Sequence, residues 1–318
     1  MSARPRLGYV GIGLMGLPMT RRLVGLGYEV TAFDIAPAQR DAADEAGARV
    51  AQSAADAARA VDWLLLNLPT TDAVEDAVFG PAGAAASLQP PQLVIDFSTN
   101  DVTRGQALAA RLHALTGCRW VDAPVSGGPP AAATGTLTVM AGGASDDIAR
   151  IAPLMADVAA RFTHMGPVGS GLAAKMINQL IVGCGHAVMA EAVVLAEAAG
   201  IDAARIPECL AGGHADGTLL QKLYPRIAAR DFRPQGYARQ LLKDLEMVNA
   251  FAGGLKAPIP MAGEALSLYR MLVHRGYAEL DTGAIFKLYE PDAPATTGAT
   301  HADAQAQAPH QTPKEDLP

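Results

Sequence analysis

The sequence is poor in features that would each point to a particular class of function. Aromatic residues make up only 5% of its 318 residues, and its formal net charge is −7, with no basic stripe. An acidic surface repels phosphate backbones, so nucleic acid is not expected as a partner. No run of about 18 uninterrupted apolar residues occurs, so no membrane-spanning segment and no membrane partner are expected.

Cysteine is also scarce. Cys118, Cys184 and Cys209 are far apart and odd in number, and no Cys-x-x-Cys pair is present to bind zinc or to shuttle electrons. The histidines form no metal-binding pattern, so no metal is expected. Free buried thiols indicate a reducing compartment, and the short basic segment before residue 7 shows no apolar leader. A cytoplasmic location is therefore predicted.

The residues that are abundant predict an α/β fold. Half of the residues are hydrophobic, and in residues 1–166 short β-branched runs alternate with segments rich in alanine and leucine. This alternation is typical of βαβ units, in which helices cover both faces of a parallel sheet. Strands are expected at 7–12, 29–33, 63–68, 93–97, 120–123, 137–141 and 162–165, and helices at 18–26 and 103–115.

The pattern changes after residue 166. Residues 172–199 lack turn signals apart from two glycines, which predicts one long helix that ends before Gly200. Charged residues such as Lys175 interrupt it, so a core helix is expected and not a membrane span. Later helices are expected to break at Pro207, 212–213, Pro225, Pro234 and Pro258.

Three regions follow from these patterns. Residues 1–166 are predicted to form a doubly wound, Rossmann-type α/β domain, and residues 167–291 an all-helical domain. Residues 292–318 contain almost no large apolar side chains. They cannot bury enough surface to offset their chain entropy, so a disordered tail is predicted.

A glycine motif joins the first expected strand to the first expected helix. Gly11 allows a tight turn, Gly13 lets the backbone approach a pyrophosphate, and Gly16 lets the helix pack closely on the strand. The phosphates would then accept hydrogen bonds at the positive end of the helix dipole. The residues predicted to contact a dinucleotide here are Gly11, Ile12, Gly13, Leu14, Met15 and Gly16.

An acidic residue follows at the distance typical of this motif. Asp34 ends the second expected strand, 18 residues after Gly16. A carboxylate there can accept hydrogen bonds from the adenosine ribose, and it would repel a 2′-phosphate. The cofactor is therefore predicted to be NAD, with NADP as the alternative.

Four sequence blocks extend this picture. Residues 11–19 read GIGLMGLPM, in which the last five letters are more specific than the glycines alone. Residues 122–128 read DAPVSGG and precede GTLT at 135–138, residues 171–179 read GLAAKMINQ, and residues 243–245 read KDL. With these blocks in this order, the sequence resembles the 3-hydroxyisobutyrate dehydrogenase family, also called β-hydroxyacid dehydrogenases.

The resemblance implies that Lys175 is the catalytic residue and that Asn178 binds the substrate beside it. The residues themselves fit these roles, because positions three apart share one face of a helix. A lysine can exchange a proton with the reacting oxygen, and it does so best when burial or a nearby cation lowers its pKa toward neutrality. The asparagine can donate and accept hydrogen bonds.

The resemblance also assigns further binding residues. Ser126, Gly127 and Gly128 expose a hydroxyl and N–H groups that can hold a substrate carboxylate. The two prolines that follow supply no N–H group, so the fit at this edge of the site can differ from that in relatives. Cofactor contacts are expected from Leu68, Pro69, Thr99 and Lys243, and Thr99 has a helix cap as its alternative role.

The predicted function is hydride transfer between NAD and a small β-hydroxyacid or its semialdehyde. Reductases of tartronate semialdehyde or succinic semialdehyde and serine-type dehydrogenases share the same blocks and stay open as alternatives. A non-catalytic nucleotide-binding reader is the alternative from another class, but Lys175 argues against it. The expected partners are a small carboxylate substrate and a second copy of the chain. The resemblance implies that residues 1–166 are the dinucleotide-binding domain, and that the all-helical domain, residues 167–291, serves substrate binding and builds a homodimer or homotetramer.

Overall fold

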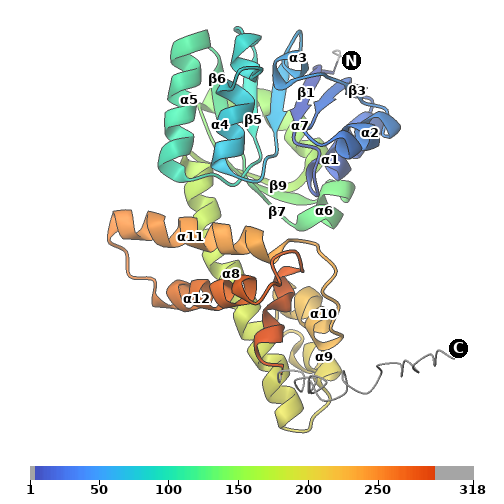
Figure 1. Ribbon diagram of the computed structural model, residues 1–318, viewed down its shortest axis with the longest axis vertical. Coiled ribbons are helices and arrows are strands. Elements are labelled where there is room, and N and C mark those ends of the chain that lie inside the picture. The colour runs from blue at the N-terminus through green and yellow to red at the C-terminus, as the bar shows by residue number, and fades with distance from the viewer. Residues whose placement is uncertain (1–3, 291–318) are drawn as a thin grey trace, which may run out of the picture. The chain divides into compact units, whose positions relative to one another are not determined.

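One mixed sheet organises the N-terminal half of the protein. The computed structural model describes residues 4–290, in which nine strands lie in the order β3-β2-β1-β4-β5-β6-β8-β7, with β9 paired to β8 (Figure 1). The strands are β1 (Leu7–Val10), β2 (Val30–Phe33), β3 (Arg49–Val50), β4 (Trp63–Leu66), β5 (Leu93–Asp96), β6 (Arg119–Asp122), β7 (Val125–Ser126), β8 (Leu137–Gly142) and β9 (Ala159–Gly166). The predicted tail, residues 292–318, lies outside the described residues.

Helices cover both faces of the sheet, as the alternating pattern predicts. On one face α1, α2, α6 and α7 bury side chains in one core, and on the other α3, α4 and α5 bury side chains in a second core. Their bounds are α1 (Gly16–Gly25), α2 (Pro37–Glu45), α3 (Ala54–Ala57), α4 (Thr71–Phe79), α5 (Val102–Thr116), α6 (Gly128–Thr134) and α7 (Ser145–Val158). All residues of the central strands β1, β4 and β5 are buried, which explains their unbroken apolar sequences.

The predicted parallel sheet is confirmed for most of its strands, but one end of the sheet is antiparallel. Strands β3 to β6 are parallel, but β8 runs antiparallel to both β6 and β7. The chain returns through the short helix α6 instead of crossing over the sheet. Strands β3 and β7, which have two residues each, were not expected, because two residues are too few to show a strand period.

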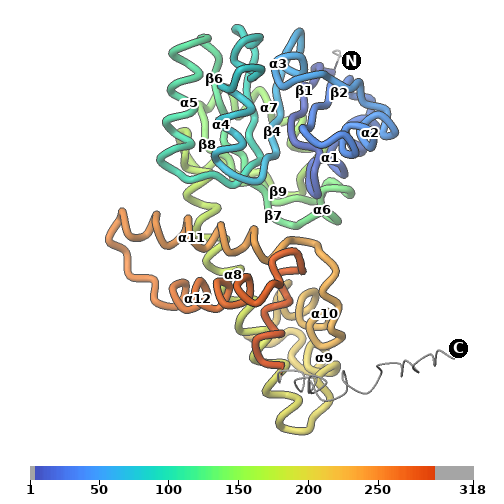
Figure 2. The backbone as a smooth tube through the Cα atoms, viewed as in Figure 1, coloured from blue at the N-terminus to red at the C-terminus, as the bar shows by residue number. Residues whose placement is uncertain are grey.

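A long helix begins where the sheet ends, as expected. Helix α8 spans Ser170–Ala198, and Gly200 follows it with φ of +68°. Within the described residues it is the one helix that could span a membrane by length and composition. It packs against β8 and against the helices α11 and α12 (Figure 2), and the expectation of a core helix stays a prediction.

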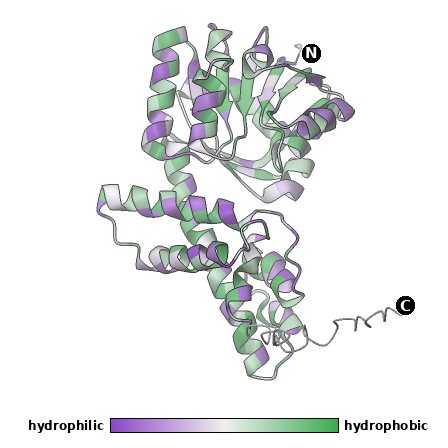
Figure 3. Ribbon diagram, in the orientation of Figure 1, coloured by the Kyte–Doolittle hydropathy of each residue, from purple (hydrophilic) through white to green (hydrophobic). Residues whose placement is uncertain are grey.

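The remainder of the described chain is helical, which confirms the prediction that the C-terminal part of the chain folds as helices. Its helices are α9 (Ile206–Leu210), α10 (Tyr224–Ala228), α11 (Ala238–Leu255) and α12 (Pro260–His274). Purple and green alternate along α11 in Figure 3, as expected for a helix with one buried face. The expected breaks at Pro207 and Pro225 fall at the starts of α9 and α10. Each proline lies in the first turn, where a helix needs no N–H from it.

The predicted domain boundary stays a prediction. Strand β9 ends at Gly166 and α8 begins four residues later, but the described chain up to Leu288 forms one compact unit. The expectation of free buried thiols is correct only in part. All three cysteines are free, Cys118 is buried, Cys184 is half-buried and Cys209 is exposed.

Candidate active site

The glycine loop between β1 and α1 has a different steric reason for each glycine. A Cβ at Gly11, where φ is +96°, would collide with the carbonyl oxygen of Asn67, and one at Gly16 would collide with that of Gly11. A Cβ at Gly13 would meet no atom within 4 Å. The fold itself therefore needs glycine at Gly11 and Gly16, whereas Gly13 leaves open space beside the start of α1.

The start of α1 can receive an anion. Met15 occupies the N-cap position without a side-chain cap, and the first turn contains no acidic residue. No side chain of the N-cap residue therefore occupies the first N–H groups of this helix. Leu14 is exposed, Met15 is half-buried and Ile12 is buried. These features fit the diphosphate of a dinucleotide.

Asp34 lies next to this loop and is bonded to it. Its carboxylate accepts hydrogen bonds from the N–H of Ile12 at 2.8 Å and from the N–H of Ala36 at 2.8 Å. Arg40 donates to the main-chain oxygens of Asp34 and Ile35 at 2.8 and 3.1 Å. Each carboxylate oxygen has a second lone pair, so Asp34 can still accept a ribose hydroxyl.

The other predicted cofactor residues meet around Lys243. Its ammonium group, on α11, donates to the carbonyl oxygens of Pro69 at 3.0 Å and Thr99 at 3.1 Å. The N–H of Leu68 donates to the Ser98 hydroxyl at 2.9 Å. The alternative role of Thr99 as a helix cap is wrong, because Asp101 caps α5. Lys243 thus joins the helical region to the ends of two strands.

Lys175 lies on α8 with its side chain turned into the protein. The residue is only 6% exposed, and its ammonium group donates to the carbonyl oxygen of Val125 at 2.8 Å. Burial lowers the pKa of Lys175 to about 8, Asp244 opposes this change and Lys243 adds to it. A lysine with this pKa can give up and take back a proton near neutral pH.

The expected carboxylate cradle begins directly after Val125. Ser126 ends β7, Gly127 has φ of +129° and Gly128 has φ of +70° where α6 begins. No side chain caps α6, and its second and third residues are prolines. The polar hydrogens in this stretch therefore come from Ser126 and the two glycines, next to the atom that Lys175 binds.

Asn178, which is expected to bind the substrate beside Lys175, bonds to a neighbouring side chain in the structure. Its side-chain amide donates to Gln179 at 2.7 Å, and Gln179 donates to Asp244 at 2.5 Å. The Asp244 carboxylate also pairs with Lys243 at 3.0 Å. Gln179 and Asp244 lie within the recognised blocks but received no role, because only the fold brings α8 and α11 together.

Two buried acids, Asp96 and Asp122, end the neighbouring strands β5 and β6, and the sequence motifs assigned a role to neither. The Asp96 carboxylate accepts hydrogen bonds from the N–H of Ser98 at 2.9 Å and from the Asn100 amide at 2.6 Å. Burial raises the pKa of Asp96 to about 7, and the charge of Asp122 adds to the rise. Each acid closes an apolar run at the carboxyl end of a strand, where ligands bind in such sheets, and that signal could have found them.

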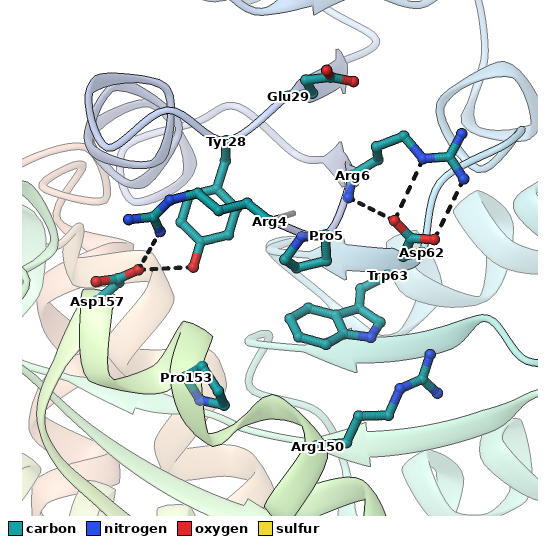
Figure 4. Close-up of a pocket in the computed structure, with 10 residues that line it drawn as sticks. All are labelled: Arg4, Pro5, Arg6, Tyr28, Glu29, Asp62, Trp63, Arg150, Pro153 and Asp157. Atoms are coloured by element: carbon teal, nitrogen blue, oxygen red, sulfur yellow. Dashed lines mark hydrogen bonds and ion pairs between the residues drawn. The ribbon is translucent and has the colours of Figure 1, made fainter. Parts of the chain in front are cut away.

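A separate hollow of about 790 Å³ lies at the opposite, amino-terminal ends of the strands (Figure 4). Arg4 there pairs with Asp157, and Arg6 pairs with Asp62. Arg150 donates to the carbonyl oxygen of Pro91 instead. Three arginines and three acidic residues line the hollow, so their formal charges balance and give no net attraction for a charged substrate. Within residues 4–290, no group of three metal-ligating side chains occurs.

Comparisons with known proteins agree on one family. Residues 6–166 match the model for the NAD binding domain of 6-phosphogluconate dehydrogenase, and residues 169–289 match the model described as NAD-binding of NADP-dependent 3-hydroxyisobutyrate dehydrogenase. An NAD-dependent L-serine dehydrogenase of Pseudomonas aeruginosa is 33% identical and covers 90% of this chain and 98% of its own length.

Solved structures extend the likeness to three dimensions. A 3-hydroxyisobutyrate dehydrogenase of Salmonella typhimurium is 30% identical with a TM-score of 0.82, covering 90% of this chain and 100% of its own. The Mycobacterium tuberculosis 3-hydroxyisobutyrate dehydrogenase with L-serine is 29% identical with a TM-score of 0.80, covering 91% of this chain and 100% of its own.

Proposed function

The chain belongs to the 3-hydroxyisobutyrate dehydrogenase family, and from that premise we propose that Lys175 is the proton-transfer residue of an NAD-dependent β-hydroxyacid dehydrogenase. The family membership makes the protein an NAD(P)-dependent oxidoreductase that acts on the CH–OH group of a small hydroxyacid. Two observations on one side chain support the role of Lys175. The lysine is buried, and its ammonium group donates a hydrogen bond to Val125, the residue directly before the Ser126–Gly128 stretch.

The chemistry of the site follows from the position of this lysine. Bound NAD supplies the carbon that accepts a hydride from the substrate. Lys175, in its neutral form, takes the hydroxyl proton as the C–O bond becomes a carbonyl, and it returns that proton in the reverse direction. Because burial brings its pKa to about 8, a useful fraction of the lysine is neutral at physiological pH.

The proposed substrate carries a carboxylate next to the carbon that bears the CH2OH group. Ser126, Gly127 and Gly128 would hold that carboxylate through the serine hydroxyl and the two N–H groups, with Asn178 orienting the reacting end. The named relatives act on L-serine and 3-hydroxyisobutyrate, which share this three-carbon unit. We take both acids as the first candidates, with tartronate and succinic semialdehydes as the alternatives.

Asp34 supports a preference for NAD over NADP. Its carboxylate lies beside the glycine loop at the place where the adenosine ribose would bind, and a 2′-phosphate there would meet like charge. Titrating the protein with NADH and with NADPH tests this choice. Tighter binding of NADPH would refute the role that we assign to Asp34.

The decisive experiment is the Lys175→Ala variant, with Lys222→Ala as an exposed-lysine control. We expect Lys175→Ala to bind NADH normally and to lose about 10²–10⁴-fold in kcat, the usual contribution of a general acid–base group. In the native protein, kcat/KM for oxidation should rise with pH through a pKa near 8, because this parameter reports the free enzyme and the base must be neutral. Near-normal turnover in Lys175→Ala would exclude the proposed role.

We also propose that the protein is a cytoplasmic homodimer or homotetramer. Ile177, Ile181, Val188 and Leu195 are all exposed large apolar residues of α8. Their spacings of four and seven place them on one helical face, which suits a second copy of the chain. Light scattering on the native protein measures the assembly, and a monomer at micromolar concentration would contradict it.

The proposed cytoplasmic location is supported by the three cysteines, which are all free, as expected in a reducing compartment.

A further inference from the structure

Helix α8 lacks a cap from its own N-terminal residues. Its N-cap is Gly169, with φ of +94° and no side chain. The first N–H groups of a helix have no partner within the helix and must be satisfied in another way when they are buried. Gly171 and Leu172, in the first turn of α8, are buried, so this helix start needs a partner from elsewhere in the chain.

The carboxylate of Asp122 is that partner. It accepts hydrogen bonds from the N–H of Gly169 at 2.7 Å and from the N–H of Leu172 at 2.9 Å. Asp122 is the last residue of β6, and it is 1% exposed. A strand of the sheet therefore caps the helix from a position 47 residues earlier in the sequence.

Two glycines lie directly against this carboxylate. A Cβ at Gly142 would lie 2.6 Å from Asp122 Oδ1, and a Cβ at Gly171 would collide with the main-chain oxygen of Met140 and approach Asp122 Oδ2 to 2.8 Å. Glycine at both positions lets the helix start and the acid come into direct contact. The negative charge at this end of the helix also complements its dipole.

The same short segment binds α8 a second time, through its functional side chain. Val125 lies three residues after Asp122, and its carbonyl oxygen accepts the hydrogen bond from Lys175. Lys175 in turn lies one helical turn after Leu172. The segment from Asp122 to Val125 thus contacts α8 at two points, and these points set where the lysine stands relative to Ser126.

We propose that Asp122 is a positioning residue for Lys175, acting by capping α8 from the end of β6. This inference rests on the proposed function only for its effect on turnover. Its effect on the lysine itself is independent of that function, because a shifted helix start would loosen the bond to Val125 and expose the ammonium group to water.

The charges around both groups set the direction of the expected change. Lys175 faces Asp244 and Lys243 of α11, and Asp122 faces Asp96 of β5. Burial raises the pKa of Asp122, and the N–H groups of Gly169 and Leu172 oppose that rise. Because burial is the main cause that lowers the pKa of Lys175, a lysine released toward water should titrate at higher pH.

The test is Asp122→Asn, which keeps the shape of the side chain and replaces one acceptor by an NH2 group. That group would face an N–H of α8, so the helix start must shift. We expect NADH affinity to stay unchanged and kcat to fall by about 10²-fold, since small misplacements of a catalytic group have effects of that size. The pKa of Lys175, measured by NMR after 13C-dimethylation, should rise.

A matched control separates this effect from the general cost of changing a buried acid. Asp147 on α7 is also 1% exposed and pairs with Arg119, but no hydrogen bond joins it to α8. Asp147→Asn should leave the pKa of Lys175 unchanged. If Asp122→Asn does not fold, Gly171→Ala shifts the same helix start while keeping the acid, and it should also raise that pKa.

The outcomes distinguish this inference from the proposed function. An unchanged Lys175 pKa in folded Asp122→Asn or Gly171→Ala would overturn the positioning role. A second result would also overturn it: Asp122→Asn lowers turnover by the same factor in the native protein and in the Lys175→Ala variant. A residue that acts through the lysine should have no effect when the lysine is absent. Normal turnover in Lys175→Ala alone would refute the proposed function and leave the pKa measurement valid.

Discussion

Gly11 and Gly13, in the loop between β1 and α1, lack a side chain for different reasons. At Gly11 the fold itself needs the absence of a Cβ, since both the positive φ and the carbonyl of Asn67 exclude one. At Gly13 no protein atom would meet a Cβ. The sequence motif treats the two glycines alike, whereas their surroundings assign the first to folding and the second to ligand approach.

This difference gives a prediction at the scale of single residues. Gly13→Ala should leave the melting temperature unchanged and weaken NADH binding by about tenfold or more, which corresponds to about 1.4 kcal/mol. Gly11→Ala should instead lower the melting temperature, because the new methyl group meets a backbone atom at a strained φ. Thermal melts and NADH titrations of both variants check this. Equal effects on stability would contradict the assignment.

Helix α8 is the element that connects the parts of the site. Its first turn rests on Asp122, its second carries Lys175, and its middle packs against α11, which supplies Lys243 and Asp244. At Gly183 the two helices come so close that a Cβ would lie 2.6 Å from a side-chain atom of Leu245. The geometry of the site therefore depends on how these two helices pack.

The corresponding prediction compares two helical glycines. Gly183→Ala should destabilise the protein, because overpacking against the fully buried Leu245 costs about 1–3 kcal/mol and exceeds the gain in helix propensity. Gly263→Ala on α12 meets only an ordinary contact at 3.9 Å, so it should stabilise the protein by about 1 kcal/mol. Urea unfolding measures both variants, and a stabilised Gly183→Ala would show that the helices can move apart.

At the scale of the whole molecule, the buried acids at the strand ends link stability to pH. Burial raises the pKa of Asp96 to about 7, whereas the unfolded chain keeps the ordinary value of 3.8. Between these values the folded protein holds a proton that the unfolded chain releases. The contribution of Asp96 to stability therefore falls as pH rises from about 4 to 7 and is constant above that range.

The Asp96→Asn variant isolates this contribution. Its melting temperature should fall less than that of the native protein between pH 5 and pH 7.5, because the amide does not titrate. Exposed Asp41→Asn on α2 should follow the native curve. Parallel pH dependences for the native protein and Asp96→Asn would mean that the Asp96 pKa is not raised. Titratable groups that do not interact with Asp96 affect native protein and variant equally, so they cancel in the difference between the two curves. That difference measures the titration of Asp96 together with its coupling to Asp122.

Most of the fold was predictable because its signals are local. The buried strands β1, β4 and β5 are continuous apolar runs, the glycine loop follows the first of them, and α8 carries an uninterrupted helical pattern to Gly200. Strand β8 was expected at 137–141, but its antiparallel direction was not predictable, since strand direction depends on where the chain returns. The two-residue strands β3 and β7 carry too short a pattern to be recognised.

The sequence by itself determined the fold class, the glycine loop with Asp34, and the lysine on a long helix. Each of these depends on residues close together in the chain or on a recognisable block. Only the tertiary structure decided that Lys243 bonds to Pro69 and Thr99, and that Asp122 caps the helix of Lys175. The physical reason is that burial, hydrogen bonds and a lowered lysine pKa arise between groups tens of residues or more apart, which meet only when the chain is folded.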